Sequence, residues 1–247
     1  MSESTAELLF ELSNIDRLTI LSEVAKEPLK LSQIARKLSA TVQETSRHLE
    51  RLSNAKFIEK DSTSAYRITN FGRLVLSLLP SLEFLERKRD FFLTHDLSSL
   101  PHVFIERIGE LSEHTFWNRL DDALARTEDV VKGAEQYLWI LADQNVRQSY
   151  SHVHPKQVSR RLVIPRNSDL QAFQHVRNEA ESELQIGFVD SVKVTVVMNE
   201  RTALVCFPGL DGRMDFTQGF AGENSKFHGW CHSLYNFYWD EASKKTW

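Results

Sequence analysis

The sequence has little of what several classes of protein require. Two cysteines among 247 residues are too few for a disulfide framework. No apolar run approaches the roughly 18 residues that a membrane-spanning helix needs. The first residues carry Glu3 and Glu7, whereas a signal peptide is basic at this position. We therefore expect a cytoplasmic protein without a membrane partner.

Signs of catalysis or of a bound cofactor are also scarce. The nine glycines are mostly isolated and form no phosphate-binding loop, so we expect no nucleotide cofactor. No Ser–His–Asp or Cys–His order stands out, and we assign no catalytic residue. His152 and His154 could supply two metal ligands, but no nearby Cys or carboxylate cluster completes a metal site. We interpret them as part of a polar loop and expect no metal.

What the chain does contain is the composition of a soluble globular protein, with 41% hydrophobic and 26% charged residues. Its length suits two modest domains. The net charge of −4 argues against nucleic acid, but residues 31–73 hold eight basic and four acidic residues, a local balance of +4. Binding to phosphates depends on local charge, so this segment remains a candidate for a DNA contact. A solvated surface could carry the same excess.

Helical spacing dominates the first part of the chain. Apolar residues between Leu8 and Leu21 predict one or two helices, which Glu27-Pro28 would end. A short helix follows, with Ser32 as its expected N-cap. After a turn at Ser39-Ala40, the segment Thr41-Val-Gln-Glu44 fits a capping box that opens the next helix.

That next helix, residues 41–53, has two distinct faces. Val42, Thr45, Leu49 and Leu52 share one side and are expected to point inward. The opposite side carries amide, carboxylate and guanidinium groups that can bond base edges in a major groove: Gln43, Glu44, Arg47 and Arg51. A solvated helix face is the alternative interpretation.

Two short strands, Phe57–Lys60 and Tyr66–Thr69, are predicted next, joined by a polar turn. The stretch LSQIARKLSATVQETSRHLERLSNAKFIEKDSTSAYRITNFG resembles the winged helix-turn-helix domains of the ArsR and MarR type, over roughly residues 5–95. Ser39 stands where many relatives have Gly. The resemblance implies that helix 41–53 enters the major groove. The residues expected to contact DNA are Ser32, Arg36, Thr41, Gln43, Glu44, Ser46, Arg47, Arg51, Lys60, Ser62, Thr63 and Arg67.

Residues 74–133 carry two apolar stripes at helical spacing. The first consists of Leu74, Leu78, Leu82, Leu85 and Phe92, and the second of Phe116, Leu120, Leu124, Thr127, Val131 and Ala134. We interpret this segment as a helical linker and dimerisation region, because a two-fold dimer suits a palindromic DNA site. Packing within one subunit is the alternative.

Residues 134–247 mix strand and helix patterns. Strands are predicted at 137–141 and 160–164, a hairpin or adjacent strands at 192–198 and 202–207, and a helix from Phe227 to Glu241. Cys206 and Cys231 fall on apolar faces and are expected to be inert core residues. An α/β domain would accommodate this mixture.

The segments AEQYLWILADQ, VTVVMNERTALVCFP, MDFTQGFAGEN and FHGWCHSLYNFYWDEA resemble the effector domain of archaeal regulators of the TrmB and FilR type. The resemblance implies a phospholipase-D-like fold, whose enzymes need a His and a Lys two residues apart, followed by an Asp. Here Lys193, Thr195 and Asn199 occupy that stretch, so we expect binding and no catalysis.

The polar loop before the last helix offers groups for a small ligand. Asp211, Arg213, Asp215, Lys226 and Trp230 are the candidates, with core packing the alternative for the aromatic residue and solvation for the charges. The expected fold class is α+β, with domains at 1–73, 74–133 and 134–247. The expected function is a homodimeric, DNA-binding transcriptional regulator, and the alternative is a winged-helix module for protein interaction.

Overall fold

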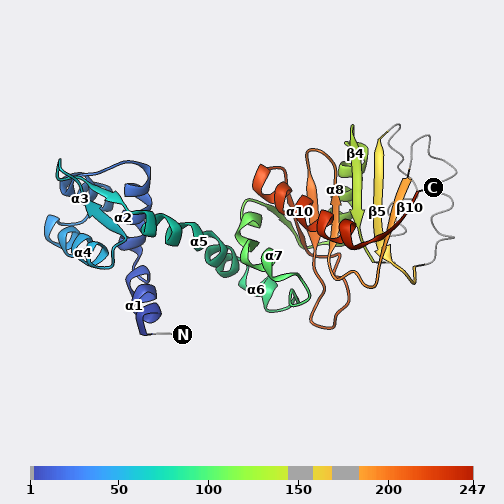
Figure 1. Cartoon of the computed structure of the whole chain (residues 1–247), viewed down its shortest axis with the longest axis horizontal. Coiled ribbons are helices and arrows are strands. Elements are labelled where there is room, and N and C mark those ends of the chain that lie inside the picture. The colour runs from blue at the N-terminus through green and yellow to red at the C-terminus, as the bar shows by residue number, and fades with distance from the viewer. Residues whose placement is uncertain (1–2, 144–157, 169–183, 247) are drawn as a thin grey trace. The chain divides into compact units, whose positions relative to one another are not determined.

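The computed structural model describes residues 3–143, 158–168 and 184–246 (Figure 1). The chain divides into two compact units, Met1–Leu79 and Pro80–Trp247. No helix of the described residues is long and apolar enough to cross a membrane.

The first unit has the element order that the sequence predicts for a winged helix. Helices α2, α3 and α4 lie together, and a two-stranded antiparallel hairpin follows them (Figure 1). The elements are α1 (Glu3–Leu12), α2 (Ile15–Lys26), α3 (Leu31–Leu38), α4 (Val42–Asn54), β1 (Ile58–Lys60), β2 (Tyr66–Ile68) and the start of α5 (Asn70–Arg87).

Aliphatic side chains from every helix of this bundle fill its core. Ile20, Ile34 and Leu49 are almost completely buried, and Phe57, which directly precedes β1, is fully buried in the same cluster. The three aliphatic residues come from the inward faces of amphipathic helices, so burial of apolar surface holds these helices together. The inward face predicted for α4 is confirmed for Thr45, Leu49 and Leu52, but Val42 is 57% exposed. Val42 is the first residue of α4, where no neighbouring helix covers the side chain.

The ends of these helices explain their lengths. Thr41 caps α4 in the capping box that the sequence predicts. The N-cap of α3 is Lys30 and not Ser32, because the helix already begins at Leu31; the Lys30 N–H donates to Gln33 Oε1 at 2.8 Å. Ser39 ends α3 in the left-handed conformation, with φ of 54°. Glycine is common at such a helix end, because it adopts the left-handed conformation without strain.

Helix α5 runs on from the hairpin without a break at Pro80 and takes part in both units. The predicted apolar stripe of α5 lies largely outside the core. Leu74, Leu78, Leu82 and Leu85 are between 38% and 68% exposed, whereas Phe84 is fully buried.

Among its described residues, the second unit is centred on an eight-stranded mixed sheet, in the order β10-β6-β5-β4-β7-β8-β9-β3. Strands β4, β5 and β6 are parallel, and the other pairings are antiparallel. The elements after α5 are α6 (Arg89–Phe92), α7 (His102–Glu106), the 3-10 turn η1 (Ile108–Leu111), β3 (Thr115–Trp117), α8 (Leu120–Lys132), β4 (Tyr137–Leu141), β5 (Ser159–Pro165), β6 (Leu184–Val189), β7 (Thr195–Met198), β8 (Ala203–Cys206), β9 (Gly219–Gly222), α10 (Ser225–Glu241) and β10 (Ser243–Thr246).

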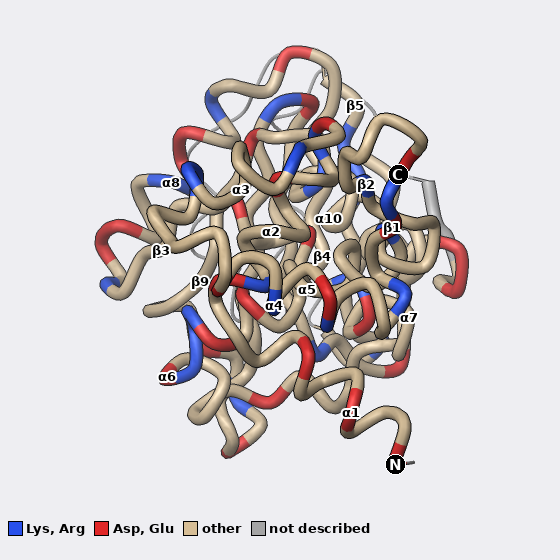
Figure 2. The backbone as a smooth tube through the Cα atoms, turned by 90° about the vertical axis from the view of Figure 1, so that its left-hand side faces the viewer, with Lys and Arg blue, Asp and Glu red and all other residues tan. Residues whose placement is uncertain are grey.

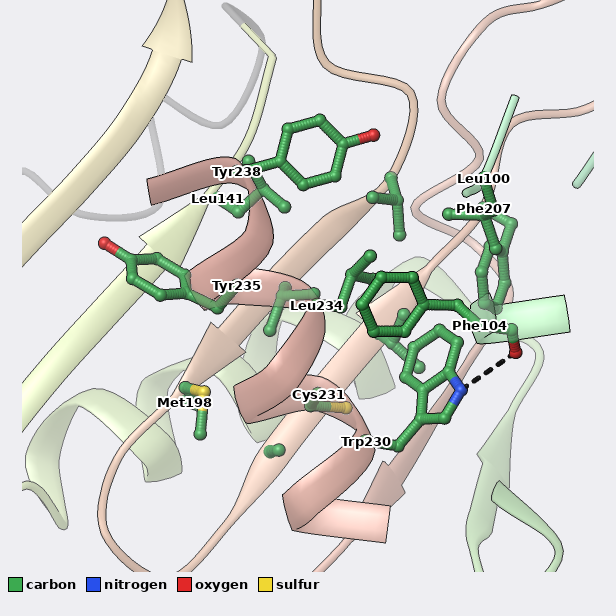
Figure 3. Packing of buried hydrophobic residues seen from close by; sticks show 14 of the residues in the cluster. Leu100, Phe104, Leu141, Met198, Phe207, Trp230, Cys231, Leu234, Tyr235 and Tyr238 are labelled. Atoms are coloured by element: carbon green, nitrogen blue, oxygen red, sulfur yellow. Dashed lines mark hydrogen bonds between the residues drawn. The ribbon is translucent and has the colours of Figure 1, made fainter. Parts of the chain in front are cut away.

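Helices cover both faces of this sheet. Alternate strand residues point to opposite sides, so Val196 and Met198 meet α10 while Val197 meets α8. The α10 side is the richer in aromatic side chains (Figure 3). Trp230 of α10 is fully buried there, and its Nε1–H donates to the carbonyl oxygen of Phe104 at 3.1 Å.

The segment 74–133, which the sequence predicts as a helical linker, is not purely helical in the structure. Phe116, assigned to a helical stripe by its spacing, lies in β3, which pairs with β9 at the edge of the sheet. Helix α8 buries Ala123, Val130 and Val131 against the sheet and leaves Leu120 and Leu124 exposed. The predicted strands 137–141 and 160–164, the hairpin of β7 and β8 and the last helix are confirmed.

Both cysteines are buried in this unit. Burial raises the pKa of the Cys206 and Cys231 thiols, because the thiolate would lose its hydration in the apolar core. Both thiols therefore stay protonated and unreactive at neutral pH.

Candidate nucleic-acid interface

The outer face of α4 presents hydrogen-bonding side chains near the start of the helix. Gln43, Ser46 and Arg47 are exposed, and Thr45 and Leu49 on the opposite side are fully buried. Burial on one side fixes the rotation of the helix about its axis, so the polar face has a defined direction. No described residue forms an ion pair with Arg47, which leaves its guanidinium open to a partner outside the chain.

Val42 adds an apolar side chain to the same exposed region, which the sequence argument assigned to the core. Residues in the first turn of a helix lie beyond the cover of a neighbouring helix, and that position could have signalled the exposure. An apolar side chain at the start of a helix can contact the methyl group of thymine in a major groove.

The capping box at the start of α4 occupies Glu44. The Thr41 hydroxyl donates to Glu44 Oε2 at 2.7 Å, and the Thr41 N–H donates to the same oxygen at 3.1 Å. The Thr41 hydroxyl, and after it the Thr41 N–H, lowers the pKa of Glu44. The carboxylate is thus ionised and oriented by the cap, and Oε1 alone is left for another partner. The main role of Thr41 and Glu44 is therefore to cap the start of α4, and not to contact DNA.

Arg51 sits in a different environment from Arg47, although both lie on the exposed side of α4. Its Nε and Nη2 donate to the two carboxylate oxygens of Glu11 at 2.9 and 2.5 Å, and its guanidinium lies 5.1 Å from the centre of the Phe10 ring. The hydrogen bond from Arg51 lowers the pKa of Glu11, and Glu11 in turn raises the pKa of Arg51. This pair ties α1 to the last turn of α4.

Helix α3 contributes two exposed candidates, Ser32 and Arg36. The neighbouring Lys37 is paired with Glu23 of α2. Lys26 and Lys37 lower the pKa of Glu23 to about 2, so this carboxylate stays ionised and holds α2 and α3 together. Arg36 has no ion-pair partner among the described residues and faces solvent.

The hairpin is folded by a carboxylate at its tip. Asp61 Oδ1 accepts hydrogen bonds from the Thr63 N–H at 2.8 Å, from the Thr63 hydroxyl at 2.8 Å and from the Ala65 N–H at 2.9 Å. The Thr63 hydroxyl contributes most to lowering the pKa of Asp61. Ser64 adopts a positive φ of 65° in the same turn. The wing therefore has a defined shape without a partner.

The side chains predicted to contact DNA from the wing are exposed: Lys60, Ser62, Thr63 and Arg67. Arg67 pairs with Glu59 at 2.8 Å across the hairpin, and the Lys60 ammonium lies 5.7 Å from the centre of the Tyr66 ring. Both signs of charge occur around α4 and the hairpin (Figure 2). Ion pairs engage Lys37, Arg51 and Arg67. The basic side chains of residues 31–73 that form no ion pair with another described residue are Arg36, Arg47, Lys56, Lys60 and Arg73.

The residues predicted to bind a ligand in the second unit do not form one site. Trp230 is completely buried and belongs to the apolar cluster on the α10 side of the sheet. Asp215 Oδ2 lies 3.2 Å from Nε2 of the buried His95, and Asp211 accepts the Arg213 N–H at 3.0 Å within its own turn. Lys226 lies exposed in the first turn of α10.

The stretch compared with phospholipase D enzymes is structural in this chain. Asn199 is buried; its Nδ2 donates to the Val130 carbonyl and its Oδ1 accepts from the Arg201 N–H, both at 2.8 Å. Thr195 is buried in β7 and Lys193 is exposed. His152 and His154 lie outside the described residues. Within the described part of the chain, no group of three or more His, Cys, Asp or Glu residues could hold a metal.

Comparison with known proteins finds a family match within the first unit. Residues 15–60 match the model of the family described as bacterial regulatory protein, arsR family. This segment spans α2, α3, α4 and β1, and so contains the helix-turn-helix. No curated protein matches the chain.

Solved structures share only a loose similarity with the chain. The archaeal chromatin protein TrmBL2 is 12% identical, with a TM-score of 0.42 and 94% of each chain covered. HmgR of Pseudomonas aeruginosa is 12% identical, with a TM-score of 0.28, covering 90% of this chain and 95% of its own. LepI in complex with SAM is 12% identical, with a TM-score of 0.24, covering 69% and 67%. These scores carry no argument about function. The match over residues 15–60 supports a DNA-binding transcriptional regulator with an arsR-type helix-turn-helix.

Proposed function

We propose that this protein is a homodimeric, sequence-specific transcriptional regulator that places α4 in the major groove of DNA. The observation that carries the proposal is the outer face of α4, where Gln43, Ser46 and Arg47 are exposed while Thr45 and Leu49 lock the other side into the core. A helix held in this way presents its polar groups in one geometry, which base recognition requires.

The chemistry of the face suggests which bases it recognises. The Arg47 guanidinium can donate two hydrogen bonds to a guanine, and the Gln43 amide can both donate to and accept from an adenine. Val42 adds an apolar contact suited to thymine. Ser32, Arg36, Lys60 and the tip of the wing would bind phosphates and fix the register of the protein on the duplex. Arg51 is engaged with Glu11 and would act by holding α4 in place.

Dimerisation through α5 would explain its exposed leucines. Leu74, Leu78, Leu82 and Leu85 are spaced by four, four and three residues, which is close to the repeat along which two helices pack. Contiguous exposed apolar surface of this kind is uncommon on a monomer. A second copy of α5 is the occupant we propose, because it would place two recognition helices on one duplex. Light scattering is expected to give a dimer mass, and a monomer at working concentrations would refute this part.

For the second unit we propose an effector domain of the TrmB or FilR type, with a phospholipase-D-like fold and no enzymatic activity. The lack of catalysis is supported by the absence of the His–Lys pair at Lys193 and Thr195 and by the structural role of Asn199. The effector fold itself rests on the resemblance of the sequence. Such a regulator would act in the cytoplasm and bind a small ligand. The ligand would act by favouring one of the two-fold arrangements that bind DNA.

The test of the DNA-binding function begins with a duplex selected by the full-length protein from random sequences. Affinity for it is expected to fall steeply with added salt, since contacts with phosphates release counterions. Arg47→Ala is expected to weaken binding by about 1–3 kcal/mol and to relax the preference for one base pair.

Arg119→Ala is the matched control, because Arg119 lies in the second unit and pairs with Asp121. Wild-type affinity of Arg47→Ala would contradict base recognition by α4. No binding to any duplex even at low salt would favour the protein-interaction alternative.

A further inference from the structure

The second unit contains a cavity of about 580 Å³ on the α8 side of its sheet, at the β3 edge. This volume lies within the range of pockets that hold small metabolites. Helix α8 supplies Arg126 and Asp129, the segment leading into β3 supplies Glu113 and His114, and the end of β9 supplies Glu223. None of the ligand residues expected from the sequence lines this cavity.

The charges around the cavity are held apart instead of neutralising one another. Within the described structure Glu113, Asp129 and Glu223 form no ion pair, and neither does Arg126. The Arg126 Nε is buried without a hydrogen-bond partner. Elsewhere on the same helix and beside it charges do pair, as in Lys132–Glu128 and Arg119–Asp121. A buried donor without a partner loses the hydrogen bond it makes with water, so the Arg126 Nε–H suits a partner from outside the chain.

Two of the carboxylates, Glu113 and Glu223, lie at the same end of the β3–β9 ladder, and both side chains are exposed. Thr115 pairs with Ala221 in the antiparallel β3–β9 ladder, and continuing that register by two residues places Glu113 opposite Glu223. The Asn224 Nδ2 donates to the Glu113 carbonyl at 2.7 Å, which holds the two segments together beyond the strands. Like charges directly opposite each other across an antiparallel pair repel. A cation bound between them would relieve the repulsion.

His114 follows Glu113 in the sequence, but its ring packs on the opposite face of the sheet, 5.4 Å from the ring of Phe84 and 4.9 Å from that of Phe220 in the α10-side core. Its Nδ1 lies 2.8 Å from the Leu111 carbonyl oxygen and 3.1 Å from that of Ser112, and both of these atoms can only accept. Burial lowers the pKa of His114, so the ring is neutral at pH 7 and its proton is on Nδ1. The His114 ring lies away from the cavity, so the acceptors open to an ammonium group there are the carboxylates of Glu113 and Glu223.

We infer that this cavity binds a small zwitterion of the α-amino-acid class, with its ammonium group between Glu113 and Glu223 and its carboxylate on Arg126. The carboxylate excess around the cavity favours the cationic end of the ligand, and the lone guanidinium requires an anionic one. The inference names a ligand class for the proposed effector role of the second unit. It rests on that role only for the claim that ligand binding regulates the protein. Binding itself is independent of DNA.

The test is a calorimetric titration of the full-length protein with the standard α-amino acids at millimolar concentrations. At least one is expected to bind. Its analogue without the amine and its analogue without the carboxylate are each expected to bind at least roughly tenfold more weakly, since each loses charged hydrogen bonds. Binding of no amino acid, or equal binding of the amine that lacks a carboxylate, would overturn the inference.

Variants locate the site. Glu113→Gln, Glu223→Gln and Arg126→Gln are each expected to lower the affinity by roughly tenfold or more. Glu128→Gln is the control on the same helix, where the carboxylate pairs with Lys132 outside the cavity, and its affinity should equal that of the wild type. Unchanged affinity in both glutamate variants would place the ligand elsewhere. Should a variant fail to fold, the comparison of analogues on the wild type still decides the question.

A separate measurement of DNA binding without amino acids keeps the two proposals distinct. Loss of amino-acid binding with DNA binding intact would overturn only the ligand site. Amino-acid binding by a chain that binds no duplex would overturn only the proposed regulator.

Discussion

The two units of the chain differ in which residue types their cores bury and in which polar groups stay free to bind a partner. The first is built mainly on aliphatic residues, with Phe57 as its largest fully buried side chain, and keeps its hydrogen-bonding groups outside on α4. The second buries aromatic residues such as Trp230 and Tyr235, which elsewhere often line ligand pockets. A residue type suited to binding is therefore informative only where the fold leaves it uncommitted. In the second unit the uncommitted groups are charges such as Arg126.

The largest effect is expected from the core of the second unit. Trp230→Ala would leave a large cavity and remove the hydrogen bond to the Phe104 carbonyl, with a loss of about 3–5 kcal/mol in the free energy of unfolding. Urea denaturation followed by near-ultraviolet circular dichroism measures it. Leu210→Ala, at a 71% exposed position, should change stability by less than about 0.5 kcal/mol. A loss of less than about 1 kcal/mol for Trp230→Ala would return this residue to the ligand candidates.

In the first unit a smaller effect is expected from the cap of α4. Thr41→Ala removes the hydroxyl that accepts from the Glu44 N–H at 3.2 Å and that orients the Glu44 carboxylate. The unfolding free energy should fall by about 1 kcal/mol, and DNA affinity should fall with it because the start of α4 frays. Thr41→Ser keeps the hydroxyl and should preserve both quantities. Equal losses for Ala and Ser would show that the methyl group, and not the cap, is what matters.

The smallest effect has the opposite sign. Ser39 holds a φ of 54°, a conformation that is strained for a residue with a side chain. Ser39→Gly should raise the thermal stability, by about 0.5 kcal/mol after allowing for the greater freedom of glycine in the unfolded chain. Ser39→Ala, which keeps the strain and loses the hydroxyl, should not stabilise. Destabilisation by glycine would mean that the Ser39 hydroxyl contributes more than the backbone strain costs.

The same contrast explains how much of the fold could be predicted. Local signals located α2, α3, α4 and the hairpin, because helical spacing, the capping box at Thr41 and the polar turn at Asp61 each act within a few residues. They erred only at helix ends, at Ser32 and Val42, where the boundary depends on which neighbour is present. In the second unit β7, β8 and α10 were recognised by the same local means.

Elements fixed by distant partners could not be predicted in this way. Strand β3 is three residues long and pairs with a strand that follows it by about a hundred residues, so its spacing resembled a helical stripe at Phe116. Of the candidate site, the exposed face of α4 followed from periodicity. The engagement of Arg51 by Glu11 did not, because that pair joins residues far apart in the sequence. The cavity at Arg126 is lined by four separate segments of the chain, so no local pattern in the sequence indicates it.

The position of β3 decides how this protein can be taken apart. A fragment that starts at residue 134 would lack both β3 and α8. It would expose the backbone of β9 at one edge of the sheet and the apolar face that α8 covers. It would also vacate the space filled by the buried Trp117. Exposed strand edges recruit other chains, so such a fragment is expected to self-associate. Dissection of the second unit should therefore begin before Thr115.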